Sequence, residues 1–67
     1  MKIIRLITLR LENNETQEQA AKKLGVSYPY YTQIESGQVK AGRGFIEKFK
    51  KVYPNESVDI FFEEVSR

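Results

Sequence analysis

Signals for starting and stopping a helix crowd into residues 16–37, and they constrain the fold more than any other feature of this chain. Thr16 is followed three residues later by Gln19, which is the spacing of a capping box. Gly25 stands where a helix that starts after this box needs a residue tolerant of positive φ. These signals predict a short helix over about residues 17–24.

A second short helix is predicted directly after the first. Ser27 is its expected N-cap, Pro29 falls in its first turn, where a missing N–H costs little, and Gly37 closes it. The expected range is about 28–36, so two short helices are joined by a tight turn. This layout lets one helix enter the major groove of DNA while the other braces it.

Apolar spacing and helix breakers predict five helices in all. The three outside the central pair are expected at about residues 3–12, at about 44–52, and after a cap at Ser57, with Val58, Phe61, Phe62 and Val65 on the last one. A loop is expected over 37–43. The prediction is one all-α domain that spans residues 1–67.

The composition excludes several classes of site. The chain has 67 residues and contains neither cysteine nor histidine. A chain this short buries only about 60% of the surface that it exposes when unfolded, which leaves no room for a catalytic cleft beside a core. Disulfides and thiolate–metal sites cannot form, and any metal would rest on carboxylates alone. We therefore expect a binding protein that is not an enzyme, with no metal and no cofactor.

Charge is spread unevenly along the chain. Residues 1–54 carry ten Lys or Arg and five acidic residues, a net charge of +5, whereas residues 55–67 carry one Arg and four acidic residues, a net charge of −3. A basic body with an acidic end fits nucleic-acid binding, although ordinary solvated helix faces would give the same pattern. Arg5 and Arg10 interrupt the N-terminal apolar run, and no stretch approaches the ~20 apolar residues of a membrane span. A cytoplasmic protein without a membrane partner is expected.

The central segment resembles the signature of the lambda-repressor/Cro-like helix-turn-helix family. The matching positions are Thr16, Gln17, Ala20, Ala21, Leu24, Gly25, Val26, Ser27, Ile34, Glu35 and Gly37. The resemblance extends to most of the chain, since residues 6–10, 45–53 and 57–62 resemble the first, fourth and fifth helices of the family. It implies a five-helix, lambda-repressor-like domain with its helix-turn-helix at the second and third helices. The implied function is sequence-specific binding of double-stranded DNA by a transcriptional regulator, expected to be a repressor.

The resemblance also implies which residues meet bases in the major groove. Tyr28, Pro29 and Gln33 occupy the positions that usually contact base edges. The amide of Gln33 can pair with adenine through two hydrogen bonds. Tyr28 can press its ring on a thymine methyl or bind a phosphate, and Pro29 offers apolar contact alone. Two aromatic residues and a proline, at Tyr28, Tyr30 and Pro29, depart from the family's common polar pattern, and they favour thymine-methyl contact or a partner other than DNA.

A second group is expected along the sugar-phosphate backbone, again by resemblance. Its members are Thr16, Gln17, Tyr30, Thr32, Lys40 and Arg43. In the family, Gln17 binds a phosphate with help from the helix N-terminus and often braces a polar residue of the recognition helix. For Tyr30, surface packing is an equally good interpretation. Solvated helix faces are the expected setting of Lys22, Lys23, Lys48, Lys50 and Lys51.

Arg10 and Glu35 are expected to form a structural pair. In similar domains these positions link the first helix to the end of the third, away from DNA. Tyr31 is expected in the core, with its hydroxyl reaching an edge. Glu15 stands where an apolar residue usually precedes the Thr-Gln pair, so the hydrophobic staple of the second helix is expected to be missing.

The expected partners are double-stranded DNA and a second copy of the chain. The acidic, aromatic stretch 58–65 cannot bury all its apolar groups in one small core, so it is a candidate dimer interface, although closure of the core is an equally good interpretation.

An alternative keeps the fold and changes the partner. The protein would then be an antitoxin-like or repressor-modulating module that binds a protein through Tyr28–Tyr30 or Phe61–Phe62. A structural or hydrolase-inhibiting domain without DNA affinity is a third possibility.

Overall fold

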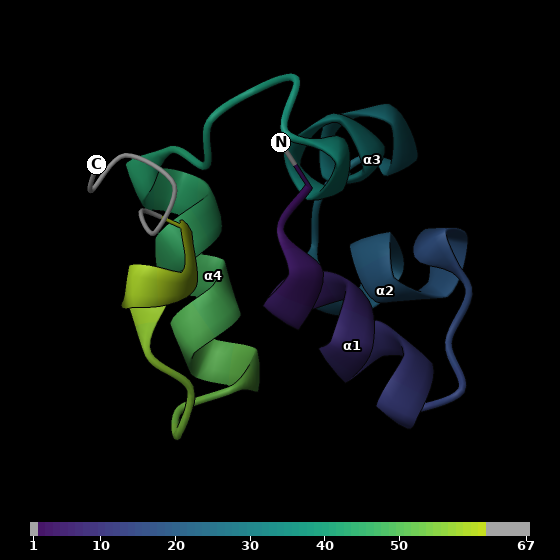
Figure 1. The fold of residues 1–67 in the computed structure, drawn as a ribbon, viewed down its shortest axis with the longest axis horizontal. Helices are drawn as coiled ribbons and strands as arrows, with labels where there is room; N and C mark the ends of the chain where they lie inside the picture. Colours follow the sequence, from purple (N-terminus) through teal and green to yellow (C-terminus); the bar gives the residue numbers. More distant parts are fainter. Residues whose placement is uncertain (1, 62–67) are drawn as a thin grey trace.

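The computed structural model describes residues 2–61, and the elements of this part are all helical (Figure 1). They are α1 (Ile4–Glu12), α2 (Gln17–Leu24), α3 (Tyr28–Ser36), α4 (Arg43–Val52) and the 3-10 helix η1 (Val58–Phe61). None of these helices is long and apolar enough to cross a membrane.

The local signals of the sequence fix the ends of α2. Thr16 Oγ1 accepts a hydrogen bond from the N–H of Gln19 at 3.1 Å, and the N–H of Thr16 donates to Gln19 Oε1 at 2.9 Å. The helix ends at Gly25, whose φ of 76° lies in the left-handed region that glycine adopts at little cost. The predicted capping box and helix stop are confirmed.

The ends of α3 also follow the prediction. Ser27 Oγ accepts from the N–H of Tyr30 at 3.3 Å, Pro29 lies in the first turn, and Gly37 ends the helix with a φ of 86°. Upstream, Asn14 takes a φ of 56° as the chain leaves α1. The two central helices therefore begin and end at the predicted residues.

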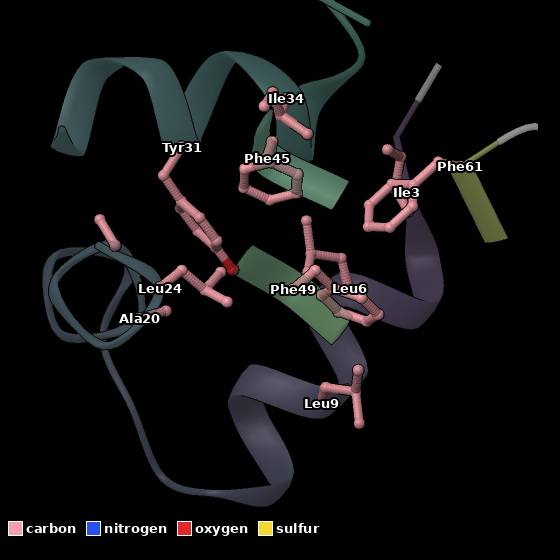
Figure 2. Close-up of a cluster of buried hydrophobic side chains, with 11 residues drawn as sticks. Ile3, Leu6, Leu9, Ala20, Leu24, Tyr31, Ile34, Phe45, Phe49 and Phe61 are labelled. Atoms are coloured by element: carbon pink, nitrogen blue, oxygen red, sulfur yellow. The ribbon is translucent and has the colours of Figure 1, made fainter. Parts of the chain in front are cut away.

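A single cluster of buried side chains joins the helices (Figure 2). Its members are Ile3, Leu6, Leu9, Ala20, Ala21, Leu24, Tyr31, Ile34, Phe45, Phe49 and Phe61. The ring of Phe61 packs edge-on against Phe45 and Phe49, with ring centroids 5.6 Å and 5.0 Å apart. Such edge-to-face pairs add to the stabilisation that burial of the rings provides. The last described element therefore closes the core.

The prediction of five helices is wrong for the described part of the chain, which has four α-helices followed by η1. The predicted cap at Ser57 is present, because its Oγ accepts from the N–H of Asp59, the second residue of η1, at 3.0 Å. The helix that follows it in the described residues is a 3-10 helix and not an α-helix. Residues 62–65 of the predicted fifth helix lie outside the described residues.

Two helix starts also differ from the prediction. Ile3 lies in the core with extended backbone, and its N–H donates to the carbonyl oxygen of Glu35 at 3.0 Å, so α1 begins one residue later, at Ile4. Conversely, α4 begins at Arg43, which was assigned to the loop. Gly42, with extended backbone, precedes it as N-cap.

Candidate nucleic-acid interface

The turn between α2 and α3 is held from both sides. The N–H of Val26 donates to the carbonyl oxygen of Ala21 at 3.0 Å, and this bond satisfies a free carbonyl at the C-terminal end of α2. From α4, Lys48 Nζ donates to the carbonyl oxygen of Gly25 at 3.1 Å. Lys48 was expected on a solvated helix face. It instead donates to a backbone acceptor of the turn. These two bonds restrain the backbone of the turn between α2 and α3.

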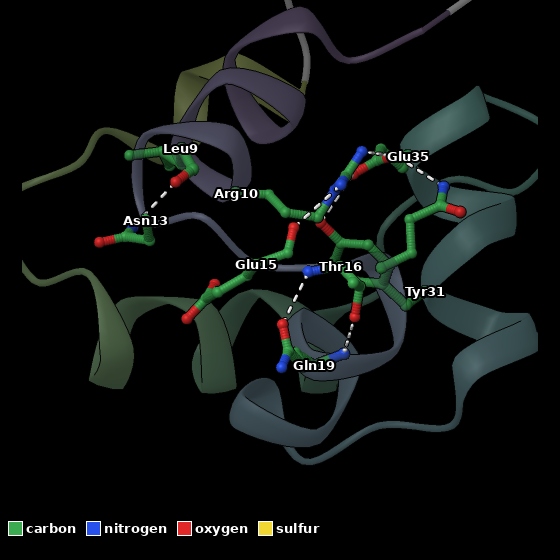
Figure 3. A network of polar contacts seen from close by, with 9 residues as sticks. Leu9, Arg10, Asn13, Glu15, Thr16, Gln19, Tyr31 and Glu35 are labelled. Atoms are coloured by element: carbon green, nitrogen blue, oxygen red, sulfur yellow. Dashed lines mark hydrogen bonds and ion pairs between the residues drawn. The ribbon is translucent and has the colours of Figure 1, made fainter.

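The buried carboxylate of Glu35 fixes α3 against the rest of the domain (Figure 3). Arg10 Nε donates to Glu35 Oε2 at 2.9 Å, and Arg10 Nη2 lies 3.4 Å from Oε1. Gln17 Nε2 donates to Oε1 at 2.8 Å, and the Tyr31 hydroxyl donates to Oε2 at 2.7 Å. The carboxylate thereby joins α1, the start of α2 and the end of α3. The expected Arg10–Glu35 pair is present.

Tyr31 differs from its prediction in one respect. It lies in the core, as expected, but its hydroxyl does not reach an edge of the domain, because the Glu35 carboxylate binds it inside. Burial and this hydrogen bond raise the pKa of the Tyr31 hydroxyl above its ordinary value. Tyr31 therefore acts as a neutral donor to the carboxylate.

Two opposing effects set the charge state of Glu35. Burial favours the neutral acid, but the hydrogen bonds from Arg10, Tyr31 and Gln17 outweigh it, so the pKa of Glu35 lies below its usual value. The hydrogen bond to Glu35 in turn raises the pKa of Arg10. At neutral pH the cluster is an ion pair with two neutral donors.

The outward face of α3 presents the three residues expected to meet bases. Tyr28 is 48% exposed, and Pro29 and Gln33 are also exposed. Pro29 and Gln33 are four residues apart and thus share one face of the helix. Thr32, assigned to the sugar-phosphate backbone, is half-buried, and its Oγ1 donates to the carbonyl oxygen of Pro29 at 2.9 Å.

Tyr30 lies against the first turn of α4. It is half-buried, and its ring meets Phe45 edge-on with the centroids 6.1 Å apart. A Cβ atom added to Gly42 would lie 3.7 Å from the Tyr30 hydroxyl oxygen. Packing therefore accounts for the ring, while the hydroxyl lies beside the N-terminus of α4.

The N-terminus of α4 carries the two basic residues expected to meet phosphates. Lys40 and Arg43 are both exposed, and neither forms an ion pair with another described residue. No described side chain caps α4, and its first turn contains no acidic residue. The first N–H groups of a helix have no partner within the helix. This end of α4 is therefore electropositive.

The N-terminus of α2 also presents free N–H groups, but unlike that of α4 it has a side-chain cap and an acidic residue. Its first N–H groups, those of Gln17 and Glu18, likewise have no partner within the helix. Thr16 Oγ1 accepts from Gln19, and the amide nitrogen of Gln17 is held by Glu35. Glu18, however, places an exposed carboxylate in the first turn, which opposes an approaching phosphate.

A second ion pair near α2 has no clear signal in the sequence. Lys23 Nζ lies 2.8 Å from Glu15 Oε2 and 4.9 Å from the centroid of the Tyr53 ring. Lys23 is exposed, as expected, but it pairs with Glu15 just before α2 and lies over the ring of Tyr53, which follows α4. The partners are eight residues apart, so no helical spacing points to the contact.

The segment after α4 is held by a third pair. Arg5 Nη2 lies 2.7 Å from Glu56 Oε2, and Lys50 Nζ donates to the carbonyl oxygens of Pro54 and Glu56 at 3.1 and 2.8 Å. Lys50 was expected on a solvated helix face, but its ammonium group binds these two backbone carbonyls. These contacts dock residues 54–56 on α1 and α4.

The fold limits the surfaces available to a protein partner. Phe61 is buried in the core, so the described half of the Phe61–Phe62 pair is not an exposed surface, contrary to the alternative interpretation. Phe62 lies outside the described residues. Within the Tyr28–Tyr30 segment, Tyr30 is turned toward Phe45, which leaves Tyr28 and Pro29 as the outward groups.

The capped two-helix unit at α2 and α3, held within an all-helical domain, defines a helix-turn-helix protein. A family model for Cro/C1-type helix-turn-helix domains matches residues 6–59, and the chain belongs to this family. The family consists of DNA-binding regulators of transcription that are typically not enzymes. No curated protein and no solved structure gave a match.

Proposed function

We propose that this protein regulates transcription by inserting α3 into the major groove of a specific double-stranded DNA site. Tyr28, Pro29 and Gln33 meet the base edges. Phosphates on either side are held at the N-termini of α2 and α4. A protein with this function works in the compartment that holds its DNA, in keeping with the cytoplasmic location expected from the sequence.

The observation that carries the proposal is the position of these two helix N-termini relative to α3. Gln17, the first residue of α2, bonds Glu35 near the end of α3. Gly42, the N-cap of α4, lies beside Tyr30 in the first turn of α3. Opposite ends of α3 are therefore flanked by free N–H groups, which favour phosphate. The exposed outward face of α3 lies between these two ends.

The phosphate contacts are assigned from the groups at each end. At α4 they are the Arg43 side chain, the first N–H groups of the helix, the Tyr30 hydroxyl and Lys40. At α2 they are the N–H groups of Gln17 and Glu18, with Thr16 Oγ1 at the edge. To bind a phosphate, the Thr32 hydroxyl turns its proton from the carbonyl oxygen of Pro29 to a phosphate oxygen, because phosphate oxygens only accept hydrogen bonds.

Repression and dimerisation complete the proposal. A dimer with two-fold symmetry places its two recognition helices about 34 Å apart, one turn of DNA, so the site is a pseudo-palindrome. A regulator bound across such a site within a promoter blocks transcription by occupying it.

The test is selection from a pool of randomised duplex DNA, followed by affinity measurements at several salt concentrations. We expect a two-fold symmetric site and an affinity that falls steeply as salt rises. Arg43→Ala should weaken binding to all sequences and reduce the salt slope by about one unit. The matched control is Lys51→Ala, which removes the same charge from the last turn of α4. Absence of salt-sensitive binding at low salt would refute the proposal and favour a protein partner at Tyr28 and Pro29.

A further inference from the structure

We infer that α3 reads an A·T-rich half-site, with adenine paired to Gln33 and thymine methyls packed on Tyr28 and Pro29. The inference rests on the proposed function and adds to it the class of sequence that is bound.

The hydrogen bonds of α3 leave few side-chain groups free for bases. Thr32 Oγ1 donates to the carbonyl oxygen of Pro29, and Ser36 Oγ donates to that of Gln33 at 3.2 Å. The Tyr31 hydroxyl is held by Glu35. The exposed amide of Gln33 makes no hydrogen bond with any residue of the described range 2–61. It therefore keeps both a donor and an acceptor free, the pair that matches N7 and N6 of adenine.

The composition of α3 lacks the groups that most often read a G·C pair. Guanine is usually read by Arg or Lys through O6 and N7, and cytosine by a carboxylate that accepts from N4. Residues 28–36 contain no Arg, Lys or Asp. Their one carboxylate, Glu35, is buried and already bound by Arg10, Tyr31 and Gln17. A G·C pair opposite this helix therefore meets no matching charged group.

The first turn of α3 presents apolar surface where many helices present N–H groups. Pro29 has no N–H, and the N–H of Tyr30 is already capped by Ser27 Oγ. Beside the N–H of Tyr28, what remains outward is the Pro29 ring and the ring of Tyr28. The Tyr28 hydroxyl is a single polar atom at the far end of its ring and lacks the separate donor and acceptor atoms of an amide. In the major groove, the apolar group that such a surface matches is the methyl of thymine.

The test begins with the half-sites enriched from the randomised pool. We expect adenine and thymine at the positions facing α3. In the selected duplex, replacing the adenine opposite Gln33 with guanine, with cytosine on the other strand, should lower affinity by about 5- to 160-fold. Replacing each contacted thymine with deoxyuridine removes only the methyl and should lower affinity by about fourfold, the factor for one buried methylene.

Protein variants separate these contacts from a preference for the shape of A·T-rich DNA. Gln33→Ala should abolish discrimination at one base pair and leave the deoxyuridine effect unchanged. Asn55→Ala, a control at an exposed polar residue after α4, should change neither. A shape preference alone would leave A·T enrichment intact in Gln33→Ala and make deoxyuridine neutral, which would overturn the inference.

The outcomes also separate this inference from the proposed function. Salt-sensitive binding with enrichment of G·C-rich half-sites, or with no enrichment, would overturn the A·T assignment while DNA binding stands. Loss of all salt-sensitive binding would remove the proposed function, and this inference with it. Enrichment of A·T-rich half-sites with the expected deoxyuridine and Gln33→Ala effects would support both.

Discussion

The hydroxyl of Tyr31 donates to Glu35 Oε2 at 2.7 Å, one turn further along α3, and both side chains are buried. The same carboxylate receives Arg10 from α1 and Gln17 from α2. The orientation of the proposed recognition helix therefore depends on one buried charge. Removing one partner of a buried carboxylate leaves its charge uncompensated and destabilises the folded protein.

Tyr31→Phe should lower the free energy of unfolding by about 2 kcal/mol, because it removes one neutral donor from a buried charge and leaves the ring in place. Urea unfolding followed by circular dichroism measures the change. The control is Tyr30→Phe, since the Tyr30 hydroxyl makes no hydrogen bond with any other described residue. Its effect on stability should stay within about 0.5 kcal/mol. Equal effects of the two variants would contradict the role assigned to Tyr31.

The depressed pKa of Glu35 predicts a loss of stability in acid. In the unfolded chain a Glu titrates at about 4.3, whereas in the folded protein its pKa is lower. The stabilisation is therefore fully present above about pH 4.3 and is lost as the pH falls through the lower folded pKa. Thermal unfolding midpoints measured from pH 7 down to pH 2 follow this loss.

Glu35→Gln should be less stable at pH 7 and should lose less additional stability between pH 5 and pH 2. Some acid sensitivity should remain, because the hydrogen bond from Arg5 also lowers the pKa of Glu56. Glu47→Gln, at an exposed position of α4, serves as the control and should retain the parent's profile. An acid profile in Glu35→Gln as steep as the parent's would show that Glu35 does not link folding to pH.

Gly25 and Gly44 give a matched pair for testing the turn. Gly25 has a φ of 76°, and an added Cβ would come no closer than 4.0 Å to another atom, here Lys48 Cδ. Gly25→Ala should therefore destabilise by backbone strain alone, about 1 kcal/mol. Gly44 lies in the first turn of α4 with nothing within 4 Å of an added Cβ, so Gly44→Ala should stabilise by about 0.5 kcal/mol. Urea midpoints that move in the same direction for both variants would rule out this explanation.

The sequence predicted the parts of the fold that short-range chemistry decides. The Thr16–Gln19 box and the left-handed glycine at position 25 are visible in consecutive residues, and the structure has both. The Arg10–Glu35 pair was expected through the family resemblance, because no local spacing connects residues 25 positions apart. The cap at Ser57 was also visible in the sequence, but it did not reveal that a 3-10 helix and not an α-helix would follow over Val58–Phe61.

The contacts that the sequence did not predict join elements distant along the chain. Lys23 and Lys48 look like ordinary solvated lysines until folding brings Glu15 to the first and the Gly25 carbonyl to the second. The direction of the Tyr31 hydroxyl likewise depends on the position of the Glu35 carboxylate, which Arg10 holds from another helix. At the candidate interface, the sequence identified the exposed residues of α3 but not that Tyr30 would turn toward Phe45.

Glu18 offers a test of whether the N-terminus of α2 lies near a phosphate. Its carboxylate in the first turn favours the helix, since the N-terminal end of a helix carries partial positive charge, but it opposes an approaching phosphate. Glu18→Gln should therefore lower stability by about 0.5 kcal/mol and raise DNA affinity several-fold at low salt, with the gain shrinking as salt rises. Glu47→Gln changes the net charge equally at an exposed position on α4, so it controls for long-range attraction. Fluorescence anisotropy with a labelled duplex measures both variants, and equal gains in the two would show that no phosphate lies at the start of α2.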